Sequence, residues 1–173
     1  MMGPPPPPAP ILVVGVGNVL LADDGVGVLL ARELAKRHLP QAEVLDGGTL
    51  GLALLPYLEG RQALVLLDAM RDEVPGELQW LPWPLPPHWG RARGLSPHEG
   101  SALELLAAAE LTGSLPPQAW LGVVTAGEVS TRIGLSQALQ ERFPSLLREV
   151  EAFVLDLARS IGVESPSAGA SKL

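Results

Sequence analysis

Short continuous apolar runs are the clearest pattern along the chain. Residues 11–16 read Ile-Leu-Val-Val-Gly-Val, and residues 63–67 read Ala-Leu-Val-Leu-Leu. Runs of this kind are typical of strands that a sheet buries on both faces. We predict strands at 11–16, 42–45, 63–67, 77–81 and 119–125, and the prolines at 82 and 84 restrict 77–81 to an edge of the sheet.

Segments with helical spacing of apolar residues lie between these runs. The first has its apolar residues at positions 26, 29, 30 and 34. Further helices are predicted at 50–58, 99–111 and 135–161, the last with a break at Phe143-Pro144 because a residue before proline avoids helical geometry. Strands and helices therefore alternate, which predicts a three-layer α/β/α sandwich around a mostly parallel, twisted sheet of about five strands.

The length and composition fit one domain, since the chain has 173 residues of which 47% are hydrophobic. We expect this domain at 11–162, a Pro-rich disordered lead at 1–10 and a disordered polar tail at 163–173. No apolar run approaches the roughly 18 residues that span a bilayer, and the N-terminus lacks the pattern of a signal peptide. We therefore expect a cytoplasmic protein without a membrane partner, and a monomer.

Cysteine is absent, and the formal net charge is −7. The absence of cysteine excludes disulfides, thiolate metal sites and cysteine nucleophiles. The negative charge, without any dense cluster of Lys or Arg, argues against a nucleic-acid partner. Contacts to a metal or a substrate must come from Asp, Glu, His or the backbone.

Acidic residues lie where two predicted strands meet the following loop. Asp68 comes directly after the strand at 63–67, and parallel sheets bind ligands outside the carboxyl ends of their strands. The alternative for Asp68 is a cap on the next turn. Asp23 and Asp24 precede the first helix, where one acidic residue commonly caps the N-terminus. Because two acids exceed the need of one cap, we expect one to cap and the other to face the site.

His98 lies in the segment Ser96-Pro97-His98-Glu99. Serine and glutamate at this spacing form a capping box, and proline suits the first helical position, so we expect His98 in the first turn of a helix. The positive helix end favours neutral imidazole, which can bind a metal. An exposed histidine without a function is the alternative, and the other two histidines of the chain lack these features.

Two further segments have more than one interpretation. We expect the segment Asp46-Gly47-Gly48-Thr49 to cap the next helix through Asp46 or Thr49. The alternative is a substrate-binding loop whose glycines let the backbone approach a peptide closely. Trp80, Trp83 and Trp89 either grip an apolar partner or pack on the sheet edge, and the sequence leaves both open.

Asp24, Asp68 and His98 come from three separate strand–helix units. Mixed carboxylate and imidazole ligands suit Zn, Ni or Fe(II) better than Ca or Mg, and three protein ligands leave positions open for substrate. The metal would orient a scissile carbonyl or lower the pKa of a water molecule. A dinucleotide fold is an alternative, but Leu20 replaces its third glycine, and two acidic charges oppose a pyrophosphate.

Four motifs in series resemble those of the NiFe-hydrogenase maturation proteases. They are the glycine-rich turn from Gly15 to Gly27, Asp46-Gly47-Gly48-Thr49, Asp68-Ala69 and Ser96-Pro97-His98. The resemblance covers about residues 11–161 in the same order and spacing. It implies a twisted sheet between helices, which agrees with the fold predicted from the apolar pattern.

The resemblance also implies an activity. These endopeptidases remove a C-terminal extension from the precursor of the hydrogenase large subunit after nickel insertion. The family's catalytic, nickel-contacting positions fall on Asp24, Asp68 and His98, and the nickel would arrive with the substrate. A nickel-dependent checkpoint protein that binds the precursor without cutting it is one alternative, and a nucleotide-binding enzyme is another.

Overall fold

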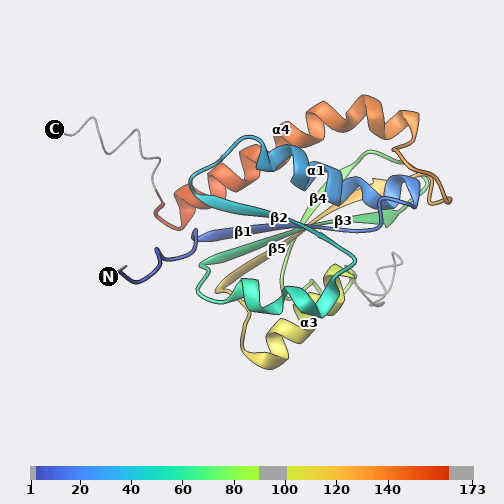
Figure 1. The fold of residues 1–173 in the computed structure, drawn as a ribbon. Coiled ribbons are helices and arrows are strands. Elements are labelled where there is room, and N and C mark those ends of the chain that lie inside the picture. The colour runs from blue at the N-terminus through green and yellow to red at the C-terminus, as the bar shows by residue number, and fades with distance from the viewer. Residues whose placement is uncertain (1–2, 90–100, 164–173) are drawn as a thin grey trace.

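A five-stranded sheet runs through the centre of the protein (Figure 1). The computed structural model describes residues 3–89 and 101–163. The strand order is β2-β1-β3-β5-β4, and all neighbours are parallel except β4, which is antiparallel to β5. The strands are β1 (Ile11–Val16), β2 (Ala42–Gly48), β3 (Ala63–Arg71), β4 (Leu78–Pro82) and β5 (Gln118–Ala126).

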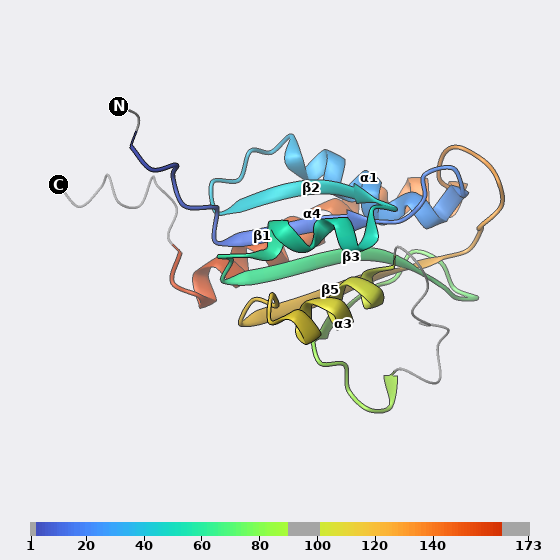
Figure 2. The same cartoon turned by 60° about the horizontal axis from the view of Figure 1, so that its bottom comes forward.

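Helices cover both faces of this sheet. The helices α1 (Val26–Ala35) and α4 (Gln137–Ser160) lie on one face, and the 3-10 helix η2 (Gly51–Leu58) lies with α3 (Ala102–Thr112) on the other (Figure 1, Figure 2). A short 3-10 helix, η1 (Ala22–Gly25), leads into α1. The predicted three-layer α/β/α sandwich is therefore confirmed. No helix in the described part of the chain is long and apolar enough to cross a bilayer.

The alternation of side chains along β1 divides the core into two layers. Ile11 and Val13 pack in the layer that holds α1 and α4, whereas Leu12 and Val14 pack in the layer that holds η2 and α3. Because all of these side chains are fully buried, the strand reads as one continuous apolar run. Each such side chain contributes about 1.5–3 kcal/mol relative to an exposed one.

Tryptophans hold the edge strand β4, which forms where the sequence predicts it. Trp80 stacks on Phe153 of α4 with the ring centroids 3.7 Å apart. Trp83 and Trp89 are partly buried against the core layer on the other face. Trp80 therefore packs on the sheet, whereas a contact of Trp83 or Trp89 with a partner stays a prediction.

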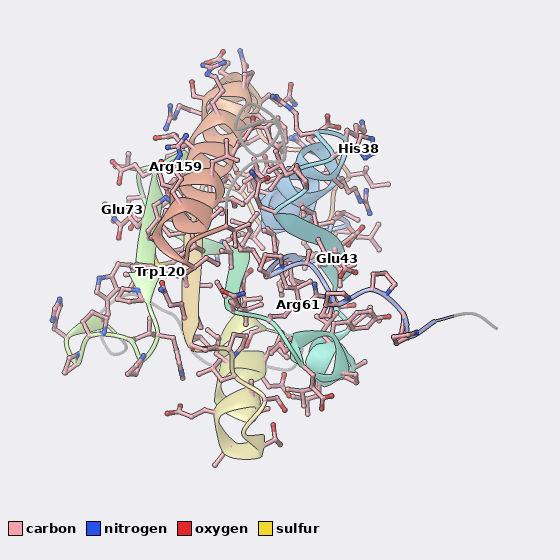
Figure 3. All side chains as sticks on the ribbon, turned by 90° about the vertical axis from the view of Figure 1, so that its left-hand side faces the viewer. His38, Glu43, Arg61, Glu73, Trp120 and Arg159 are labelled. Carbon is pink, nitrogen blue, oxygen red and sulfur yellow. The ribbon has the colours of Figure 1, made fainter. Side chains whose placement is uncertain are left out.

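Arg61 ties together the amino-terminal ends of the strands (Figure 3). Its guanidinium donates to the carbonyl oxygens of Ala9 at 2.9 Å and Tyr57 at 3.0 Å, and it forms an ion pair with Glu43 of β2. Arg61 is buried, so these partners satisfy its donors away from water. These contacts are structural, and they join the chain before β1 to η2 and β2.

Two helices on opposite faces differ from the sequence prediction. The segment 51–58 is a 3-10 helix, and α4 runs unbroken with Pro144 inside it. The predicted break at Phe143-Pro144 is therefore wrong. Leu139 before the proline and Leu146 after it are both buried in the same core layer, and this packing holds the helix together across the missing hydrogen bond.

The third difference is the start of α3, which is Ala102 rather than a residue near Pro97. Ser101 is the N-cap, and its hydroxyl accepts from the backbone N–H of Glu104 at 3.1 Å. The sequence contains two Ser-x-x-Glu segments in succession, and the second leads directly into the buried side chains of this helix. The first segment, with Ser96, Pro97 and His98, lies outside the described residues.

Candidate functional site

The strand order reverses between β1 and β3. From β1 the chain passes through α1 on one face to β2, and it then returns through η2 on the opposite face to β3, on the other side of β1. Open α/β sheets bind ligands outside the carboxyl ends of the strands at such a switch point. The two acidic residues predicted for the site, Asp24 and Asp68, both lie here.

Asp24 lies in η1, beyond the carboxyl end of β1, and is partly exposed. Its Oδ2 accepts from the backbone N–H of Asn18 at 2.9 Å, and the Asn18 side chain accepts from the backbone N–H of Leu20 at 2.9 Å. Among residues 3–89 and 101–163, no hydrogen bond reaches Oδ1 of Asp24. One carboxylate oxygen thus closes the preceding turn, and the other has no hydrogen-bond donor among the described residues.

Asp68 was predicted to end its strand, but β3 continues to Arg71. Strand β1 pairs with β3 only as far as Leu67, whereas β5 pairs with it to the end. Asp68 is therefore the first residue of β3 that does not pair with β1. This places Asp68 at the switch point, although β3 itself continues. Its carboxylate accepts from the backbone N–H groups of Ala69 at 2.8 Å and of Ala102, the first residue of α3, at 3.3 Å.

Gly27 brings the two acidic segments together. A Cβ at this position would lie 2.3 Å from the carbonyl oxygen of Leu67 and 2.9 Å from that of Val16, so only glycine permits the approach. Gly27 follows Asp24 closely in the chain, Leu67 precedes Asp68, and η1 contacts β3. The structure thus brings two predicted site residues from separate strand–helix units to one edge of the sheet.

Asp23, unlike its neighbour, is fully buried. Asp23 does not cap α1, because α1 begins without a hydrogen bond from its backbone to a capping side chain. The predicted acidic cap is therefore wrong. Burial alone would raise the pKa of Asp23, but hydrogen bonds from Ser136, Glu128 and Gly127 outweigh burial and lower the pKa below its ordinary 3.8. The sequence could not identify this role, because the nearest of these donors lies 104 residues further along the chain.

The segment 46–49 lies on the same edge of the sheet. Strand β2 extends through Gly48, and Asp46 pairs with Arg32 of α1 at 2.7 Å. Since η2 starts without a side-chain cap, the predicted cap by Asp46 or Thr49 is wrong. The backbone N–H of Gly17 donates to the carbonyl of Gly48 at 3.0 Å, which joins the segment to the end of β1. A contact of Asp46, Gly47, Gly48 and Thr49 with substrate stays a prediction.

His98 lies outside the described residues, so its place beside the two carboxylates stays a prediction. The described histidines lie elsewhere: His38 follows α1 near the amino-terminal ends of the strands (Figure 3), and His88 is exposed. Within residues 3–89 and 101–163, no three His, Asp or Glu side chains form a group that could hold a metal. That finding does not cover a group that includes His98.

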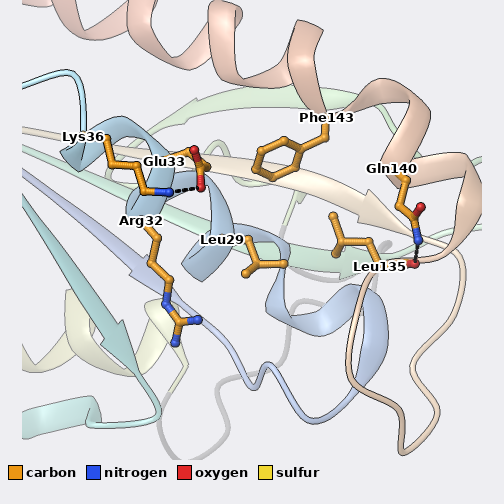
Figure 4. A pocket seen from close by; sticks show the side chains of 7 residues that line it. All are labelled: Leu29, Arg32, Glu33, Lys36, Leu135, Gln140 and Phe143. Carbon is orange, nitrogen blue, oxygen red and sulfur yellow. Dashed lines mark hydrogen bonds and ion pairs between the residues drawn. The ribbon is translucent and has the colours of Figure 1, made fainter.

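A pocket of about 650 Å³ lies between α1 and α4 (Figure 4). Its floor is apolar, and its charged side chains are paired at 2.7 Å, Lys36 with Glu33 and Arg32 with Asp46. It is lined by Leu29, Arg32, Glu33, Lys36, Leu135, Gln140 and Phe143. None of the predicted site residues lines this pocket, so the switch point is kept as the candidate site.

Known proteins share both the sequence pattern and the fold. A family model, HycI, described as hydrogenase maturation protease, matches residues 28–152. The hydrogenase 2 maturation protease of Escherichia coli (strain K12) is 33% identical over 159 residues, which are 90% of this chain and 94% of that protein. The hydrogenase expression/formation protein HupD of Rhodobacter capsulatus is 35% identical over 154 residues, which are 87% of this chain and 68% of that protein. The solved structure of the hydrogenase maturating endopeptidase HybD from E. coli has a TM-score of 0.68 and 30% identity, and covers 88% of this chain and 93% of that chain.

The fold and the two carboxylates define a small α/β enzyme with its candidate site at the carboxyl ends of β1 and β3. The chain belongs to the hydrogenase maturation protease family, and it is a hydrolase of that type. The resemblance drawn from the sequence motifs is confirmed. The nucleotide-binding alternative has no support from these relatives.

Proposed function

We propose that this protein removes the C-terminal extension of a hydrogenase large-subunit precursor in the cytoplasm after nickel insertion. Nickel already bound in the precursor contacts Asp24, Asp68 and His98, and this contact positions the scissile peptide. The observation that supports the proposal is that the segments carrying Asp24 and Asp68, from separate strand–helix units, lie at the same switch point. The relatives named as maturation proteases support cleavage over binding alone.

The donor set suits the proposed ion. Carboxylate and imidazole together fit nickel, and they would leave the ion's ligands from the precursor in place. The backbone N–H of Ala102 donates to Asp68, and His98 precedes Ala102 by four positions. Four residues of chain span at most about 14 Å, so the length of this segment is compatible with the proposed place of His98 near Asp68.

The proposed chemistry depends on orientation. The precursor holds the ion, and side chains from separate strand–helix units contact it. These contacts fix the distance between the ion and the scissile peptide. Positioning of this kind makes the reaction of a bound peptide effectively unimolecular, and a displacement of about 1 Å can cost about 100-fold in rate. Cleavage is therefore conditional on nickel, because a precursor without the ion is not positioned.

The test uses purified nickel-loaded precursor, with the mass of the large subunit as the readout. Asp24→Asn, Asp68→Asn and His98→Ala should each slow cleavage by about 100-fold or more. Asp156→Asn is the control, because Asp156 is an exposed residue of α4 paired with Arg159. Wild-type protein should leave nickel-free precursor uncut.

Two outcomes would overturn the proposal. One is undiminished processing by Asp68→Asn or His98→Ala. The other is a precursor that forms a complex with the wild-type protein in a nickel-dependent way while its mass stays unchanged. The second result would establish the non-cleaving checkpoint instead.

A further inference from the structure

Asp23 is a buried carboxylate that the proposed chemistry does not use. It has no exposed surface, whereas the adjacent Asp24 is partly exposed. Its Oδ1 accepts from the backbone N–H of Ser136 at 2.7 Å, and its Oδ2 accepts from the Ser136 hydroxyl at 2.8 Å. The backbone N–H groups of Glu128 at 3.0 Å and Gly127 at 3.1 Å donate to the same Oδ2. Hydrogen bonds to a charged acceptor are stronger than neutral ones, so this carboxylate constrains the positions of Gly127, Glu128 and Ser136.

These donors belong to both ends of one loop. Residues 127–136 connect β5 to α4, and Gly127 and Ser136 are the first and last of them. Ser136 is also the N-cap of α4, where its hydroxyl accepts from the backbone N–H of Leu139 at 3.5 Å. One side chain of η1 therefore holds the loop closed at its base and connects it to the start of the longest helix.

The backbone of η1 is joined to the same loop. Ala22 donates its N–H to the carbonyl of Arg132 at 2.7 Å, and Arg132 donates to the carbonyl of Leu20 at 3.0 Å. Ala22 has a φ of 49°, a left-handed conformation that costs a residue other than glycine about 1–3 kcal/mol and persists only where its surroundings enforce it. The hydrogen bonds from the loop hold Ala22 in this conformation, directly before the two acidic residues.

We propose that Asp23 is a positioning residue for Asp24, which it holds at the switch point by fastening η1 to the loop 127–136. The inference rests on the function proposed above, because it takes Asp24 to contact the precursor's nickel. A helix of a single turn cannot fix the direction of its own side chains, and η1 begins without a side-chain cap. The fastening to the loop supplies that rigidity, so loss of Asp23 releases Asp24 while leaving its carboxylate in the protein.

Asp23→Asn tests this, because the amide keeps the shape of the side chain but replaces one accepting oxygen with a donor that faces N–H groups. We expect cleavage of nickel-loaded precursor to slow by about tenfold or more at a temperature where the variant is folded. Leu157→Ala is the control for lost stability. The cavity that it creates lies near the carboxyl end of α4, in the core layer that holds α1 and α4. This variant should keep its cleavage rate.

A double-mutant cycle separates positioning from a general structural effect. The readout is the dissociation constant of each variant for nickel-loaded precursor, measured at low temperature before cleavage. Asp23→Asn should weaken binding in the wild-type background and have no further effect in the Asp24→Asn background. Equal losses in both backgrounds, or an unchanged rate for Asp23→Asn alone, would overturn the inference. Failure of the proposed function looks different, because Asp24→Asn itself would then cleave at the wild-type rate.

Discussion

Replacing Gly27 with alanine tests how closely α1 must approach β3 for the site to form. The added Cβ would lie 2.3 Å from the Leu67 carbonyl oxygen and 2.7 Å from the carbon of the same carbonyl. Carbon and oxygen atoms in close contact normally stand about 3.3–3.6 Å apart, so the start of α1 has to move by about 1 Å. Both obstructing atoms belong to the backbone of Leu67, which is paired with β1 on one side and β5 on the other and therefore cannot turn aside. The start of α1 must therefore move instead, and it displaces η1 and Asp24 with it.

The expected magnitudes follow from two opposing effects on stability. Alanine is the better helix former by about 1 kcal/mol, whereas forcing extra volume into a packed contact costs about 1–3 kcal/mol. Gly27→Ala should therefore lower the free energy of unfolding by about 2 kcal/mol or less. The effect on cleavage is larger, because a shift of about 1 Å between reacting groups can cost about 100-fold.

The assay compares cleavage of nickel-loaded precursor with urea unfolding of the same preparation. Gly113→Ala is the matched control, because Gly113 has a φ of 74° and an added Cβ there would meet nothing within 4 Å. Alanine in that conformation costs about 1–2 kcal/mol, at the end of α3 away from the site. The control should lose stability and keep its cleavage rate. A Gly27→Ala protein that cleaves as fast as the control would refute the reasoning that the helix contact positions Asp24.

Two further predictions concern stability. Pro144→Ala should raise the free energy of unfolding by about 2 kcal/mol, since proline inside a helix costs about 3 kcal/mol and its stiffening of the unfolded chain returns about 1 kcal/mol. Thermal unfolding should show a gain of about 4–8 °C, Ser145→Ala is the neighbouring control, and an unchanged midpoint would contradict the prediction. The lowered pKa of Asp23 predicts that its contribution to stability is present above pH 3.8 and is lost as the pH falls through the folded-state pKa. The difference in unfolding free energy between wild-type and Asp23→Asn protein should therefore shrink below pH 4 in urea titrations, and a constant difference would exclude this origin.

The strands could be predicted because their signal is local. Ile11 to Val14 are buried on both faces of the sheet, so burial leaves no polar position and the run is visible in the sequence. The edge strand β4 was found from Pro82 for a similar reason, since a missing N–H is tolerated only at an edge. The alternation of strands and helices predicted that Asp24 and Asp68 lie near the carboxyl ends of strands, whereas the strand order that makes this place a switch point comes from the structure.

The errors came from interactions that are distant in the sequence. Pro144 was expected to break α4, but burial on both sides of it overrides the local preference. Asp68 was expected to end β3, but pairing with β5 carries the strand further. One of Asp23 and Asp24 was expected to cap α1, but the hydrogen-bond partners of Asp23 lie in the loop between β5 and α4. No local pattern distinguishes Asp23 from Asp24, because each residue's role depends on which chain segment folds against it.

The hydrogen bond from Ala102 to Asp68 joins the two ends of a long excursion of the chain. The polypeptide leaves the switch point after Asp68 and returns to it at the first turn of α3. The carboxylate of Asp68 therefore closes this excursion into a loop, so one side chain of the candidate site also joins α3 to the sheet.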